Sequence, residues 1–267
     1  VLSNLSRLLT YMNAALYAIL GALLFFMPEQ LAPVFAWKVT PFMTMTIGGW
    51  CLGNAWLAFF AARRWRWEKV FTSLFYLWIF GIGELLVVYL FRSKVVLNHP
   101  IAWLYLITLV TNAAAAYVGV IELARFRPGL EPSSVTTNSI QYYLLISFIV
   151  FVGFLGLYGW TAQNGAPGTN GGIFPEIMSP FTLRSFGMFY LALSLSVIPL
   201  LRYRSLNTYL SHGFISYGLV VFITAAAVVY IRLFDFAARP GGLLYIGAYV
   251  GVAVVFLIYF YTYGTGR

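Results

Sequence analysis

The stretch IAWLYLITLVTNAAAAYVGV, residues 101–120, decides the fold class of this chain. Thr108, Thr111 and Asn112 are its only clearly polar interruptions. A helix rises about 1.5 Å per residue, so the stretch can cross the roughly 30 Å hydrocarbon core of a bilayer. Its apolar run is continuous, whereas a strand of a transmembrane barrel alternates between apolar and polar residues. The stretch therefore predicts a membrane-spanning α-helix.

Similar apolar stretches account for almost the whole chain. We expect eight spans, at residues 8–27, 41–62, 70–91, 101–123, 140–161, 181–201, 213–233 and 241–263. Helices are the natural spanning form because each one satisfies its own backbone hydrogen bonds in lipid. The connecting segments are short and leave no room for a soluble catalytic domain. The sequence therefore predicts an all-α polytopic membrane protein.

The composition supports lipid as the solvent of this chain and as its first partner. Hydrophobic residues make up 61% of the sequence and charged residues 9%, against about 25% charged in a typical soluble domain. The formal net charge of +9 would suggest nucleic acid as a partner in a soluble protein. Here the basic residues lie mostly at span ends, where they meet anionic lipid headgroups. We therefore expect bound lipids and no nucleic-acid partner.

The basic residues also predict an orientation. They are more numerous on one side, which carries Arg7, Arg63, Arg64, Arg66, Lys69, Arg125, Arg127, Arg202, Arg204 and Arg267. The positive-inside rule places this side in the cytoplasm, together with both termini, and we expect a bacterial cytoplasmic membrane. The strongest membrane-interface anchor is the cluster Arg63, Arg64, Trp65, Arg66 and Trp67, whose Trp residues suit the headgroup level.

The two halves of the chain resemble each other at an offset near 140 residues. Thr40-Pro41-Phe42 opens one span and Ser179-Pro180-Phe181 opens another, and Gly48 and Arg63 match Gly187 and Arg202. Because each half has an even number of spans, both halves enter the membrane from the same side, as two parallel four-helix repeats. We expect the first repeat at residues 1–127, a cytoplasmic linker at 128–139 and the second repeat at 140–267. Pro41, Pro100, Pro180 and Pro240 are expected to begin helices.

Glu84 is the most pointed candidate for a functional residue, because a carboxylate inside a span is costly unless it is paired or wetted. Arg184, about one turn inside its span from the same face, is a possible partner, and Asn112 is a further polar residue within the spans. The three form a candidate buried polar site. They predict a proton or cation site, a structural tie of Glu84 to an arginine or a hydroxyl between the two repeats, or a protonated Glu84 bonded to a backbone carbonyl.

Other polar and small residues suggest contacts between helices. Asn13, Asn54 and Asn112 are expected to hydrogen-bond across helices. Glycines three or four residues apart predict close helix packing in three places: Gly49/Gly53, Gly153/Gly156/Gly159 and Gly247/Gly251.

No motif for catalysis or metal binding is evident, and we expect neither a catalytic residue nor a metal ligand. His99 and His212 fall on opposite faces of the membrane, so they cannot both ligate one haem. Each is expected to hydrogen-bond water or a headgroup, although either one alone could ligate a pigment or a metal. Aromatic residues make up 19% of the chain. They indicate packing or, alternatively, a surface for a flat hydrophobic ligand, so the cofactor remains unknown.

Three functions fit these features. The first is a non-catalytic integral membrane subunit that scaffolds or stabilises a larger membrane protein complex, with other membrane subunits as partners. The second is a small transporter or channel that uses Glu84 and Arg184 near the outer half of the bilayer. The third is a quinone- or pigment-binding membrane protein.

Overall fold

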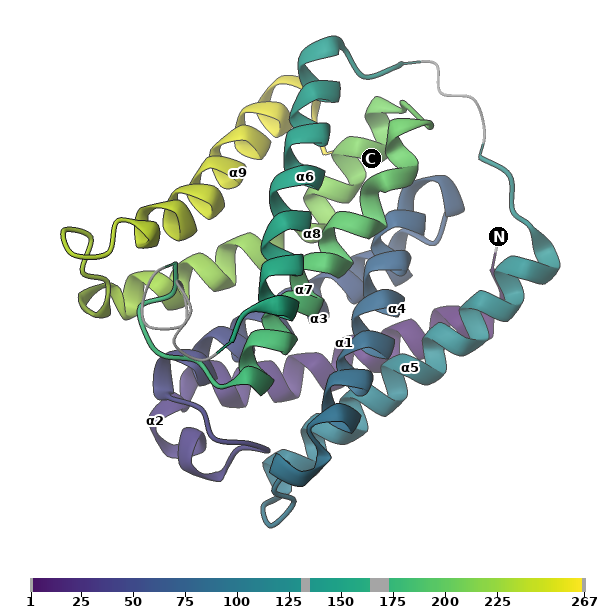
Figure 1. Ribbon diagram of the computed structural model, residues 1–267. Helices are drawn as coiled ribbons and strands as arrows, with labels where there is room; N and C mark the ends of the chain where they lie inside the picture. Colours follow the sequence, from purple (N-terminus) through teal and green to yellow (C-terminus); the bar gives the residue numbers. More distant parts are fainter. Residues whose placement is uncertain (1, 131–134, 164–172, 266–267) are drawn as a thin grey trace.

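Eight membrane-length helices make up most of the computed structural model, which describes residues 2–130, 135–163 and 173–265 (Figure 1). No strand is present in these ranges, so the predicted all-α polytopic fold is confirmed. The long helices are α1 (Asn4–Phe26), α3 (Pro41–Arg64), α4 (Trp67–Leu90), α5 (Pro100–Phe126), α6 (Ser139–Thr161), α7 (Pro180–Val197), α8 (Leu206–Val229) and α9 (Gly241–Tyr263). Short turns of helix are α2 (Pro28–Leu31), η1 (Ala32–Val34), η2 (Arg92–Lys94), η3 (Ile198–Leu201) and η4 (Ile231–Leu233).

The predicted proline starts agree with the observed helix boundaries. Pro41, Pro100 and Pro180 are the first residues of their helices, and Pro240 precedes the first residue of α9. At this position the missing N–H of proline would have no helical partner in any case. Thr40 caps α3 by accepting a hydrogen bond from the Met43 backbone N–H at 3.2 Å. Local sequence signals therefore account for these helix ends.

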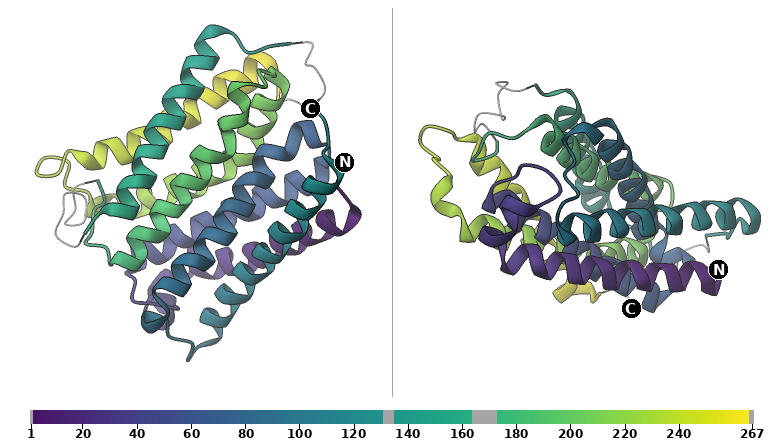
Figure 2. Two further views of the ribbon diagram at one scale, coloured as in Figure 1. Left: turned by 45° about the vertical axis from the view of Figure 1, so that its right-hand side comes forward. Right: turned by 90° about the horizontal axis from the view of Figure 1, so that it is seen from below.

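The helices differ widely in how much of their surface the protein covers. In α3, 78% of the most apolar window is buried, because α1, α4 and α8 all pack against it. In α9 the corresponding share is 6%, and α8 is its main neighbour. Helices from the two halves are in contact through the pairs α3–α8 and α4–α7 (Figure 2). The bundle is thus built around α3, with α9 at its edge.

Two of the three predicted small-residue contacts are confirmed. A Cβ atom on Gly53 would lie 2.6 Å from the Leu219 Cα atom, so α3 and α8 approach closely there. A Cβ atom on Gly159 would lie 2.6 Å from the Gly187 Cα atom, which brings α6 close to α7. The third prediction is wrong. Cβ atoms at Gly247 and Gly251 would have no neighbour within 4 Å among the described residues, so this face of α9 is open in that part of the structure.

One face of the bundle collects the basic helix ends, and we call it the basic face. It carries Arg63, Arg64, Arg66, Lys69, Arg125, Arg127, Arg202 and Arg204. Both ends of the described chain lie there, since Trp65 Nε1 donates to the Leu2 carbonyl at 3.1 Å and Arg64 donates to the Thr265 carbonyl at 3.3 Å. Part of the predicted linker, residues 131–134, lies outside the described residues.

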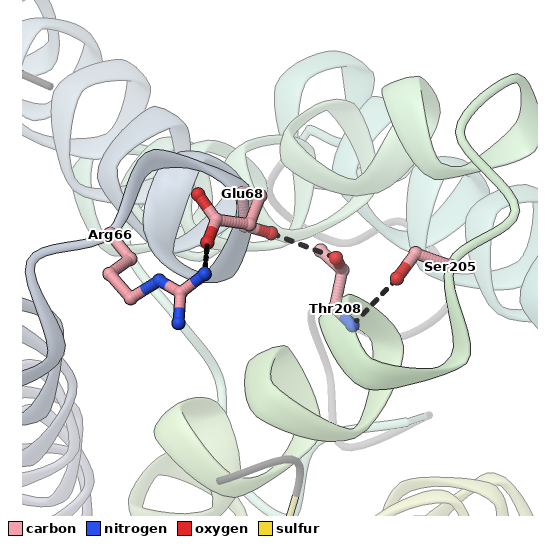
Figure 3. A network of polar contacts seen from close by, with 4 residues as sticks. All are labelled: Arg66, Glu68, Ser205 and Thr208. Carbon is pink, nitrogen blue, oxygen red and sulfur yellow. Dashed lines mark hydrogen bonds and ion pairs between the residues drawn. The ribbon is translucent and has the colours of Figure 1, made fainter. Parts of the chain in front are cut away.

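A small polar network at the basic face joins α4 to α8 (Figure 3). The Thr208 hydroxyl donates to the Glu68 carbonyl at 2.8 Å, while the Ser205 hydroxyl accepts from the Thr208 N–H at 3.2 Å and caps α8. Arg66 pairs with the Glu68 carboxylate at 2.6 Å. Exposed ion pairs contribute little stability, so the hydrogen bond between the helices is the more significant tie.

Candidate functional site

A groove of about 560 Å³ opens between α6, α7, α8 and α9. It runs along α9 from Leu243 to Phe256, a length of roughly 20 Å at the helical rise. Its walls are mainly apolar, as is usual for ligand sites, and include Leu145, Phe151, Leu193, Leu219, Val252 and Val255. The groove separates α6 from α9, which are the first and last of the second four long helices. The corresponding helices among the first four, α1 and α5, pack on each other.

The open glycine face of α9 forms one wall of this groove. Gly247 and Gly251 both line it, and a Cβ atom on either would have no neighbour within 4 Å in the part of the chain that the structure describes. The helix face for which the sequence predicts close packing therefore presents no side chains to the groove at these two positions. The missing side chains widen the groove.

His212 lies in the wall of the groove. Its predicted position relative to the helix was wrong. The expected span began at residue 213, which left His212 at a membrane boundary, but α8 begins at Leu206 and His212 is 7% exposed. Its Nδ1 atom has no hydrogen-bond partner in the described part of the chain. A buried polar atom without a partner costs free energy, so His212 is a candidate for binding a polar group of a ligand.

Two further features place polar groups along the groove. The Tyr245 hydroxyl, on a side chain that is 4% exposed, also lacks a partner within the described residues. Tyr190 and Tyr249 join α7 to α9 through their hydroxyls at 3.1 Å. One of these hydroxyls donates to the other, so the hydrogen of the second is not used in this contact.

Glu84 is buried in α4, as predicted, and its site is separate from the groove. Its side chain is 2% exposed, and Oε1 accepts a hydrogen bond from the Tyr105 hydroxyl of α5 at 2.8 Å. Ser185 of α7 is the other polar neighbour of the carboxyl group. Glu84 therefore lies where α4 and α5 meet α7.

Arg184 does not pair with Glu84 in the described structure, so the expected pair is wrong. Its guanidinium donates instead to the carbonyls of Gly159 at 2.9 Å and Ala162 at 2.7 Å. These carbonyls lie at the C-terminal end of α6, where backbone C=O groups have no N–H partner within the helix. A cation is also favoured there by the helix dipole, so Arg184 acts as a cap for α6.

Asn112 lies in a hydrogen-bond network that joins α1, α4 and α5. Its Nδ2 donates to the Tyr17 hydroxyl at 2.9 Å and to the Leu77 carbonyl at 3.1 Å, and its Oδ1 accepts from Asn13 at 3.3 Å. Asn54 accepts a separate hydrogen bond from the Tyr76 hydroxyl at 2.8 Å. The predicted role of these asparagines as ties between helices is confirmed. Glu84, Arg184 and Asn112 each contact different partners, so the structure does not bring them together as one polar site.

The predicted membrane-interface anchor, residues 63–67, is exposed in part, and its other side chains contact the rest of the protein. Arg63 and Arg66 are exposed at the basic face. Trp65 donates to the Leu2 carbonyl, and Trp67 is 7% exposed and packs on Phe71. Trp67 is therefore covered by the protein, so its ring does not lie on the exposed surface as the predicted anchor requires.

Arg64, in the same cluster, ties α3 to α8. It donates to the Ser211 hydroxyl at 2.9 Å, and its guanidinium carbon lies 4.6 Å from the centre of the Phe214 ring. Cation–π contacts of this kind add stability where the cation is partly desolvated.

Within the described residues, no group of three or more His, Cys, Asp and Glu side chains could hold a metal ion. The comparisons add no relative: no family model, curated protein or solved structure matches this chain significantly. The function is therefore argued from the groove and the buried polar residues alone.

Proposed function

We propose that this protein is a non-catalytic integral membrane protein that binds an elongated hydrophobic ligand in the groove between α6 and α9. The observation that carries the proposal is the groove itself, about 560 Å³ in volume. Ligand pockets commonly measure about 300–1,000 Å³ and combine apolar walls with a few placed polar groups. Here those polar groups include His212 and Tyr245.

A groove-filling substitution tests this proposal. A leucine at position 251 would enter open space, so Gly251→Leu should fold while it blocks the groove. Gly129→Leu is the matched control, because none of the described residues comes within 4 Å of the Gly129 Cβ position and Gly129 lies in the linker. The wild type and the control should co-purify with a stoichiometric organic-extractable compound, identified by mass spectrometry, and Gly251→Leu should lose it. Equal amounts in all three proteins would refute the proposal.

A second candidate is the role of a subunit in a larger membrane assembly. The exposure of α9 favours it, because the protein buries only Gly242 and Tyr245 of this helix. Native mass spectrometry after gentle detergent extraction tests it. A stoichiometric partner polypeptide supports the subunit role, and a self-contained monomer opposes it. The transporter interpretation then rests on Glu84 without Arg184 as its partner, because Arg184 bonds to α6 and not to Glu84.

The parallel repeat remains part of the proposal. In such a repeat α3 corresponds to α7 and α4 corresponds to α8. Exchange of the two halves therefore turns the pair α3–α8 into the pair α7–α4. Both pairs pack closely, which supports a pseudo-two-fold arrangement. We also propose that the basic face is cytoplasmic, because it holds the eight Arg and Lys residues named above together with Arg7, which is nine of the sixteen in the chain. Accessibility labelling of single cysteines introduced at Arg127 and Arg232, in a Cys51→Ala background, tests this orientation.

A further inference from the structure

We propose that the groove ligand is an isoprenoid quinone whose uncharged head lies at His212 and whose chain follows α9. This inference rests on the proposed function and adds the chemistry and the orientation of the ligand. It concerns binding alone and assigns no electron transfer to the protein.

The lining of the groove argues for an uncharged head. No Asp, Glu, Lys or Arg is among the described residues that line it. A charge placed between membrane helices needs a partner or water, and these walls supply no countercharge. A phosphate headgroup is therefore a poor match, whereas a neutral head with oxygen atoms is a good one.

The polar groups locate that head in the half of the groove near the basic face. His212 is about 9 Å along α8 from the helix start, and Ser147 is about 12 Å along α6 from its start, both measured from the basic face. Ser216 lines the same region and donates its hydroxyl hydrogen to the His212 carbonyl at 2.8 Å. Two walls of the groove thus present polar side chains at a similar depth.

The hydrogen-bonding capacity of these groups suits a carbonyl. An imidazole and a serine hydroxyl can each donate, and a quinone carbonyl can only accept. The unpartnered Nδ1 of His212 is covered in the ligand-free groove, and a rotation of the imidazole toward the ligand would give it the hydrogen bond that the described part of the protein does not supply. The Tyr209 and Phe256 rings, whose centroids are 5.7 Å apart, line the groove beside His212 and offer apolar contact to the rest of the head.

The remainder of the groove suits a branched apolar chain. From the level of His212 it continues along α9 past Gly251 and Gly247 toward Tyr245. Because these glycines carry no side chain, the groove is wide enough there for methyl branches as well as for a straight chain. A chain in this position would cover apolar wall residues that otherwise face lipid.

Equilibrium binding in delipidated dodecyl maltoside micelles tests the inference. The probes are tritiated menatetrenone, a quinone with a short isoprenoid chain, and tritiated squalene, an isoprenoid hydrocarbon without a head. His212→Phe should weaken menatetrenone binding about fivefold to tenfold and leave squalene binding unchanged. His212→Asn, which can restore a donor near Nδ1, should recover most of the affinity.

Controls keep the test decisive. His99→Phe changes the other histidine, which is exposed at the start of α5, and should bind both probes like the wild type. If His212→Phe does not fold, Ser147→Ala replaces it, since Ser147 is exposed in the groove and its loss should weaken menatetrenone binding about twofold to fivefold.

The outcomes separate the inference from the proposed function. Equal menatetrenone affinity in the wild type, His212→Phe and Ser147→Ala would overturn the quinone inference. The groove would still stand as a ligand site if Gly251→Leu abolished squalene binding. If Gly251→Leu bound both probes normally, both proposals would fail. A stoichiometric haem or chlorophyll absorption band in the protein purified from native membranes would also overturn the quinone inference.

Discussion

Phe256 on α9 lies directly over Gly213 on α8, so that a Cβ atom at position 213 would come within 2.0 Å of the Phe256 Cε1 atom. Gly213 follows His212, and Phe256 lines the groove. We expect Gly213→Ala to displace the Phe256 ring into the groove and to weaken ligand binding several-fold. Measurement of menatetrenone affinity checks this, and unchanged affinity would contradict it.

The glycines of the membrane helices should differ sharply in their tolerance of alanine. A Cβ atom on Gly48 would lie 2.5 Å from the Phe25 backbone nitrogen, so Gly48→Ala should force α1 and α3 apart and cost about 1–3 kcal/mol. Gly251 has open space, so Gly251→Ala should stabilise its helix by up to about 1 kcal/mol. Thermal unfolding in detergent measures both changes. Equal effects of the two substitutions would argue against an open glycine face on α9.

The fold could be predicted from the sequence because its signals are local. A long apolar run such as residues 101–120 has one compatible structure in a bilayer, and a proline with a preceding Thr or Ser marks a helix start without reference to the rest of the chain. Asn112 was also predictable as a tie, since a buried amide needs partners wherever they lie.

The groove could not be predicted because it depends on which helices fail to meet. Gly247 and Gly251 have the same spacing as Gly49 and Gly53, yet one pair faces a groove and the other faces α8. Polar residues in the first turns of α8, such as Asn207 and Ser211, lower its local hydropathy, so the predicted span began too late and His212 was placed outside it. The Ser205 side chain, as a helix cap, was the available signal for the true start.

Arg184 should stabilise the end of α6. Arg184→Met removes the donors to the Gly159 and Ala162 carbonyls while it keeps most of the apolar stem. We expect a loss of about 1.5–3 kcal/mol in stability, and faster hydrogen exchange near the end of α6. Arg232→Met, at an exposed arginine, is the control and should show neither effect. Normal exchange protection of α6 in Arg184→Met would contradict the capping role.

Glu84 should act through the hydrogen bond that it accepts from Tyr105. Glu84→Leu leaves the buried Tyr105 hydroxyl without this acceptor and should cost about 1–3 kcal/mol of stability, whereas Glu84→Gln keeps a carbonyl acceptor and should be close to wild type. Unfolding in detergent distinguishes the two variants. If Glu84→Gln were as damaging as Glu84→Leu, the carboxyl group itself would be required, which would favour an ion-binding role.

Glu176, outside the spans, should give stability a dependence on pH. Burial raises the pKa of its carboxyl group above the ordinary value of 4.5, although a hydrogen bond from Thr40 opposes the shift. The folded state therefore holds the proton more tightly than the unfolded state does. This contribution to stability is fully present below pH 4.5 and is lost as the pH rises through the folded pKa.

Melting temperatures of the wild type and Glu176→Gln between pH 4 and pH 8, about the range in which a perturbed carboxyl group titrates, measure that contribution. The wild type should lose stability relative to Glu176→Gln as the pH rises. A difference that does not change with pH, or that changes in the opposite direction, would contradict the assignment.

The most direct test of the ligand groove is an experimental structure of the protein purified from native membranes without added lipid. Our account predicts one continuous, elongated density between α6 and α9, beginning beside His212 and running past Gly251 toward Tyr245. A groove closed by direct contact between α6 and α9, or filled by a helix of another polypeptide, would contradict it.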